Sequence, residues 1–151
     1  MTEVDVTVTG PEPQVQLPDV MEPVLDLHLQ HLIKMLNDDE TKKSHFGISL
    51  NIPGGVIYGQ AISRDAYLDA WEAEIRQSSG AGAEFIATLP RKISEVGDKL
   101  VKGRDTKPLP RWIHLREATF LTGAPVQTMH YGLWRGRLSD VAGWSFSLPS
   151  A

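Results

Sequence analysis

Residues 128–149 read TMHYGLWRGRLSDVAGWSFSLP, and this stretch holds the densest set of side chains that could bind a ligand. Alternate side chains of a β-strand face opposite sides, so Arg135 and Arg137 would share one face, with Trp134 on the other. Arginine forks suit carboxylates and phosphates, so the pair could hold an anion or an acidic partner. The same pattern also allows a solvated strand face whose arginine stems cover apolar surface. Trp134, Arg135 and Arg137 are our first candidates for a partner-binding surface.

A second group of basic side chains lies in the polar, proline-flanked segment that ends near Pro110. It comprises Lys99, Lys102, Arg104, Lys107 and Arg111. We take Lys102, Arg104 and Lys107 as the second candidates for partner binding. The first 33 residues contain six acidic residues and no lysine or arginine, so this leader could dock on the basic segment. The whole chain carries a net charge of −4, which is a poor electrostatic trap for a phosphate backbone.

Residue types that carry catalysis or bind metals form no recognisable pattern. The absence of cysteine removes thiol nucleophiles and thiolate zinc sites. His28 and His31 have the i, i+3 spacing that can share a metal, with Asp26 nearby, but no further ligand is evident. The segment 143–147, GWSFS, misses the nucleophile-elbow pattern because its last residue is not glycine. We therefore predict no catalytic residue, no metal and no cofactor.

The bulk composition is that of one ordinary folded domain. The chain has 151 residues, of which 41% are hydrophobic and 23% charged. No apolar run approaches the roughly 20 residues that span a bilayer, and the first residues lack the basic and apolar regions of a secretory signal. We expect a cytoplasmic protein with no membrane partner. We expect residues 1–18 to form an acidic, proline-containing flexible leader and residues 19–151 to form a single domain.

Hydrophobic periodicity predicts a helix and then a hairpin at the start of this domain. We expect the helix to be capped by Asp19 or Glu22, with Pro23 in its first turn, and to end at residues 37–39. Its apolar face comprises Leu25, Leu29, Leu32, Ile33 and Leu36. Residues 46–52 then alternate between apolar and polar, a glycine-rich turn follows, and residues 56–62 return as the partner strand. Gly59 inside that strand indicates a bend or a close backbone approach.

Helical residues separate this hairpin from the remaining strands. Ser63 can cap a second helix, and a third helical segment follows, which Pro90 would kink or split. The apolar set of this third segment is Phe85, Ile86, Leu89, Ile93, Val96 and Leu100. The insert and the basic segment together occupy about residues 64–110.

Three more strands complete the predicted sheet, at residues 111–121, 128–140 and 144–148. Ile113 and Leu115 share a face with Ala118 and Phe120 only if the register slips near residues 116–117, which predicts a β-bulge. The fold class is therefore α+β: an N-terminal helix, a bent five-stranded antiparallel sheet and a helical insert between strands 2 and 3.

The order and spacing of these motifs resemble the gas vesicle accessory protein U family over about residues 19–149. The matching parts are ISLNIPGGVIYGQAISRDAYLDAW, WIHLREATFLTG and LWRGRLSDVAGWSFSL. The resemblance implies a small, cytoplasmic, non-enzymatic protein that acts in vesicle assembly, stability or association. Its partners would be gas vesicle shell or assembly proteins, and an exposed sheet edge would also allow homo-oligomers.

A smaller resemblance is to Sm-like RNA-binding proteins, whose sheet is curled. It lies in the initial helix, the sharply turned hairpin and the Arg135-Gly136 pair. The chain departs from that family in its long helical insert and in lacking an Asp-x-x-x-Asn pattern, since Asp65 is followed by Ala-Tyr-Leu-Asp69. An Sm-like nucleic-acid-binding module is thus the alternative function, with nucleic acid the less favoured partner.

Tryptophans are the remaining candidates for a binding surface. Aromatic residues in strands mostly pack in the core, but tryptophan is also enriched in interfaces. We expect one or two of the four to reach an oligomer or partner surface: Trp71, Trp112, Trp134 and Trp144.

Overall fold

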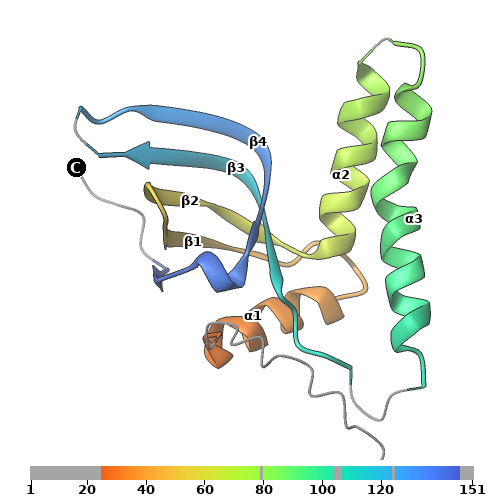
Figure 1. Ribbon diagram of the computed structural model, residues 1–151, viewed down its shortest axis with the longest axis horizontal. Helices are drawn as coiled ribbons and strands as arrows, with labels where there is room; N and C mark the ends of the chain where they lie inside the picture. The colour runs from red at the N-terminus through yellow and green to blue at the C-terminus, as the bar shows by residue number, and fades with distance from the viewer. Residues whose placement is uncertain (1–24, 79, 104–106, 124, 147–151) are drawn as a thin grey trace, which may run out of the picture.

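The computed structural model describes residues 25–78, 80–103, 107–123 and 125–146 (Figure 1). The acidic leader and the predicted helix caps before Leu25 lie outside these residues. The elements in the described part are α1 (Leu27–Asp38), β1 (His45–Ile52), β2 (Gly55–Ile62), α2 (Arg64–Gln77), α3 (Ala83–Val101), β3 (Trp112–Thr122), β4 (Thr128–Arg137), a 3₁₀ turn (Leu138–Asp140) and β5 (Gly143–Ser145). The strands form an antiparallel sheet in the order β4-β3-β2-β1-β5, which confirms the α+β class. The sheet is open, so the Sm-like curl does not close into a barrel.

Helix α1 begins at Leu27 because Asp26 caps it. The Asp26 side chain accepts a hydrogen bond from the Leu29 backbone N–H at 3.0 Å, as an N-cap residue does. The predicted caps at Asp19 and Glu22 were therefore wrong for this helix. The helix ends at Asp38, as predicted, and buries Leu29, Ile33 and Leu36.

The main core lies between α1 and one face of the sheet. Ile48 and Leu50 of β1, Ile57 of β2, and Ile113 and Leu115 of β3 are all fully buried there. A smaller apolar cluster lies where α2 meets the end of β2, with Tyr67 and Leu68 packed on Ile62. These two clusters fix α1 and α2 against the sheet. The candidate site lies on the face of β3 and β4 that is turned toward α2.

The predicted β-bulge is present and bends β3. The register between β2 and β3 shifts between Tyr58 and Gln60, and Glu117 has a positive φ of 49°. Gly59 faces this bulge so closely that a Cβ atom there would lie 3.0 Å from the Ala118 Cα atom. The close approach predicted at Gly59 is therefore confirmed. Figure 1 shows β3 and β4 curving together toward the helices.

Helices α2 and α3 form an antiparallel hairpin beside the sheet, with α2 nearer the strands and α3 on the outer side (Figure 1). Ser63 caps α2, as predicted, by accepting a hydrogen bond from the Ala66 N–H at 3.1 Å. Helix α3 runs through Pro90 without being split. Charged pairs join the two helices, including Arg76 to Glu84 at 3.0 Å.

The end of β4 differs from the prediction. The strand stops at Arg137, and residues 138–140 form the 3₁₀ turn that places Leu138 in the core. Arg137 then pairs with Asp140 across this turn. Strand β5 begins at Gly143, and Leu148, its predicted end, lies outside the described residues.

Candidate partner-binding surface

Trp134 contributes mainly to packing. It is half-buried against the main core, and its indole lies over Gly136. A Cβ atom on Gly136 would come within 2.0 Å of the Trp134 ring, so a larger residue here would displace the indole. The Trp-Arg-Gly sequence therefore lets a large ring lie flat along its own strand.

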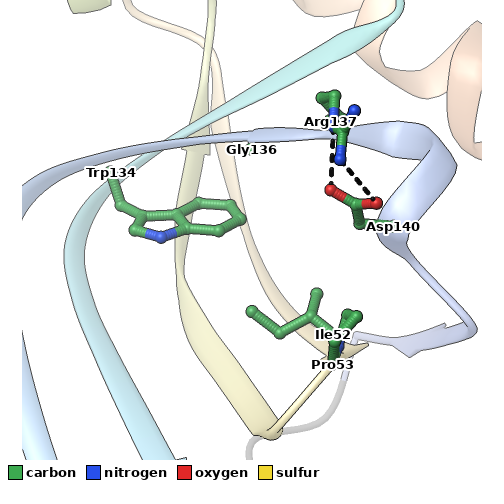
Figure 2. A pocket seen from close by; sticks show the side chains of 6 residues that line it. All are labelled: Ile52, Pro53, Trp134, Gly136, Arg137 and Asp140. Atoms are coloured by element: carbon green, nitrogen blue, oxygen red, sulfur yellow. Dashed lines mark hydrogen bonds and ion pairs between the residues drawn. The ribbon is translucent and has the colours of Figure 1, made fainter.

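A shallow hollow of about 210 Å³ lies beside Trp134 (Figure 2). Ile52 and Pro53 of the first hairpin face the indole across it, and Arg137 and Asp140 lie at its rim. The Arg137 guanidinium donates to Asp140 through Nε at 3.0 Å and through Nη2 at 3.2 Å. Because this fork is already used within the chain, Arg137 is a poor candidate for holding an external anion.

Arg135 lies on the opposite face of β4. Its guanidinium carbon stacks 3.7 Å from the centroid of the Trp112 ring, a cation–π contact that fixes the side chain. No described residue forms a salt bridge with Arg135, whereas Arg64, Arg76 and Arg91 all pair with carboxylates. Partial burial also lowers the pKa of Arg135. The result is a partly desolvated positive charge whose guanidinium forms no hydrogen bond or ion pair with a described residue.

His114 and Tyr67 form the floor beside this arginine. His114 pairs with Arg135 across β3 and β4, and its ring lies 4.6 Å from that of Tyr67. The histidine is 5% exposed, and its Nδ1 atom has no hydrogen-bond partner among the described residues. Burial, then the charges of Arg135 and Arg64, lower its pKa to about 3. His114 is therefore neutral near pH 7, and the charge of the site comes from Arg135. We call Tyr67, Trp112, His114 and Arg135 the Arg135 patch.

The second candidates are not part of this patch. Lys102 is exposed at the C-cap of α3, and Lys107 is exposed in the segment before β3. Within the described residues, neither makes a hydrogen bond or ion pair to the patch. Arg104 lies outside the described residues. These positions remain predictions.

The sequence alone does not predict the Arg135 patch as a unit, because Trp112 is one of four tryptophans and His114 stands apart from the other histidines in the sequence. The signal that joins them is the β3–β4 register, which places His114 opposite Arg135 and Trp112 opposite Arg137. That register is a long-range pairing that local spacing does not encode.

Two of the three residues considered for a metal, Asp26 and His31, make other contacts. The Asp26 carboxylate accepts a hydrogen bond from the Trp144 indole at 3.1 Å as well as capping α1. A ring nitrogen of His31 lies 2.7 Å from the Leu27 carbonyl oxygen. Across the part of the chain that the structure describes, no three histidine or acidic side chains come together as a metal site would require.

None of the described helices combines the length and apolar character that a bilayer span requires.

These features define an α+β domain with an open antiparallel sheet and a surface arginine that lacks a carboxylate partner among the described residues. A sequence model of the gas vesicle protein GvpU-like family matches residues 26–148, so the chain belongs to this family. Neither the curated proteins nor the solved structures provide a match.

Proposed function

We propose that this chain is a non-enzymatic accessory protein that binds an acidic segment of a gas vesicle shell or assembly protein through the Arg135 patch. Membership of the GvpU-like family supports an association with gas vesicles. In this proposal the protein acts in the cytoplasm, on vesicle assembly, stability or association.

The observation that carries the proposal is the state of Arg135. The Trp112 ring covers one face of its guanidinium, and no described residue accepts a hydrogen bond from the N–H edge, which could donate to a carboxylate of a partner. Stacking also reduces the rotamer entropy that binding would otherwise cost. His114 is neutral, so Arg135 supplies the positive charge that attracts the carboxylate. An acidic side chain of a partner fits this chemistry.

Co-flotation with intact gas vesicles tests the proposal. We expect the wild-type protein to float with the vesicles and Arg135→Glu to bind about tenfold or more weakly, because the variant places like charges together. Lys43→Glu is the matched control, since it makes the same charge change at an exposed residue before β1. Added salt should weaken wild-type flotation more than that of Arg135→Glu. Equal flotation of Arg135→Glu and wild type would contradict the proposal.

The Sm-like alternative gains no specific support. Asp65 lies in the first turn of α2 and pairs with Arg64 at 3.6 Å. It therefore does not sit in a base-binding loop.

A further inference from the structure

Helix α3 carries a row of apolar side chains on its exposed side. The row comprises Ile86, Leu89, Ile93, Val96 and Leu100, whose exposed fractions range from 38% to 77%. Phe85 lies beside its first residue and is also exposed. Contiguous apolar surface of this kind marks an interaction site in a folded domain.

The spacing within this row is that of a coiled-coil seam. Successive members lie three, four, three and four residues apart, which is the a and d pattern of the heptad repeat. The opposite side of the helix faces α2: Ala87 is fully buried there, and the Trp71 indole donates to the Ile86 carbonyl oxygen at 3.3 Å. Figure 1 shows α3 on the outer side of the hairpin. Among the described residues, this apolar side of α3 is therefore exposed.

The charges beside the seam indicate what that helix carries. Lys92 and Lys99 occupy the g positions and form no ion pair with a described residue. The α3 carboxylates Glu84 and Asp98 are instead paired with Arg76 and Arg64 at 3.0 Å. The third carboxylate of α3, Glu95, is exposed three residues after Lys92 and four before Lys99. This border of the seam thus carries two lysines and one glutamate and is net positive.

We propose that α3 docks an amphipathic helix of a partner protein whose apolar seam is bordered by glutamate or aspartate. Residues at g select the partner of a coiled coil through their charge. A second copy of this chain fits less well. Antiparallel pairing would place g lysines against each other, and parallel pairing would place them against Pro90 and Gly97, which carry no carboxylate. This inference does not depend on the proposed vesicle function.

A synthetic helical peptide with Ile and Leu at a and d and glutamate at e and g is a direct probe. Its binding to the full-length protein can be measured by the fluorescence anisotropy of the labelled peptide. Its own glutamates oppose self-pairing at neutral pH. We expect the protein to bind this peptide about tenfold or more tightly than a peptide with lysine at e and g. Ile93→Glu should weaken binding by a similar factor, because it places a charge in the seam. Met35→Glu on α1, another exposed apolar residue, is the matched control and should bind as wild type.

Charge reversal gives a second measurement. The double variant Lys92→Glu/Lys99→Glu should prefer the lysine peptide, because the border of the seam then becomes acidic. Equal binding of both peptides, or of wild type and Ile93→Glu, would overturn the proposal. Wild-type dimers in sedimentation that Ile93→Glu dissociates would assign the seam to a second copy instead. Binding to phosphatidylglycerol vesicles that Ile93→Glu abolishes would assign it to a lipid surface.

Discussion

The chemistry of the Arg135 patch depends on a histidine that stays neutral. His114 is enclosed by the Tyr67 ring and by strands β3 and β4, and the nearest cations are Arg135 and Arg64. Burial and these charges both disfavour the imidazolium form. A neutral His114 therefore lies beside the Arg135 guanidinium without charge repulsion.

The depressed pKa of His114 predicts a loss of stability in mild acid. The unfolded chain takes up a proton below the ordinary value of 6.5, but the folded chain resists protonation until about pH 3. The stability that the neutral His114 contributes is thus complete above pH 6.5 and is lost progressively as the pH falls from 6.5 toward 3. The free energy of unfolding then falls with a limiting slope of about 1.4 kcal/mol per pH unit. Urea unfolding between about pH 7 and pH 5, above most carboxyl pKa values, isolates the effect.

The His114→Phe variant tests this assignment. It should unfold with less pH dependence over the same range, since phenylalanine fills a similar space and has no titrating group. His45→Phe removes an exposed histidine and should keep the wild-type dependence. An unchanged slope in His114→Phe would show that another group is responsible.

At the scale of elements, the alternation of side chains along a strand predicted the bend of the sheet but not the end of β4. Ile113 and Ala118 are five residues apart, so a regular strand would place them on opposite faces. Both are apolar and belong in the core, so a bulge was required between them. Leu138, by contrast, continues the alternation of Trp134 and Gly136, although the backbone turns there. The apolar pattern is the same whether a strand continues or a turn carries the residue inward. Tertiary packing decides between them.

Periodicity predicted α3 in the same limited way. It identified a helix and its apolar residues. Of the expectation that Pro90 would kink or split the helix, the split was wrong, because α3 continues through Pro90. An apolar face shows that a helix needs a neighbour, but it does not show whether that neighbour belongs to the same chain. The α2 side of α3 is occupied through polar pairs such as Arg91 with Glu72 at 2.5 Å. The apolar side is therefore left outside.

Asp26 connects two elements that are distant in the sequence. Its carboxylate caps α1 and also accepts the Trp144 indole N–H, which holds β5 against the start of the helix. We expect Asp26→Ala to lower the melting temperature, and Trp144→Phe to lower it as well. Because both remove the same hydrogen bond, the double variant should lose less than the two single losses combined.

Thermal unfolding of the four proteins in this cycle measures the coupling. Asp26→Asn is the control for the cap, because asparagine also caps helices well. Strict additivity in the cycle would show that the hydrogen bond to Trp144 adds nothing to stability.

At the scale of the whole molecule, the two halves are held by different forces. The sheet and α1 share a closed apolar core, whereas the α2–α3 hairpin is joined by exposed ion pairs such as Arg64 with Asp98. Exposed pairs contribute little each and are screened by salt. Ala87 is the one fully buried apolar residue of α3 within the described chain. Stability should therefore fall from the sheet to the outer helix.

Hydrogen–deuterium exchange can locate this gradient. Amides of α3 should exchange faster than those of β1 and β2, and molar salt should accelerate exchange in α3 while leaving the two strands nearly unchanged. The acidic peptide that pairs with the α3 seam should protect the same amides, because a bound helix replaces the missing apolar neighbour. If α3 exchanged as slowly as the strands and ignored salt, the hairpin would be part of one cooperative unit, and a loosely attached outer helix would be excluded.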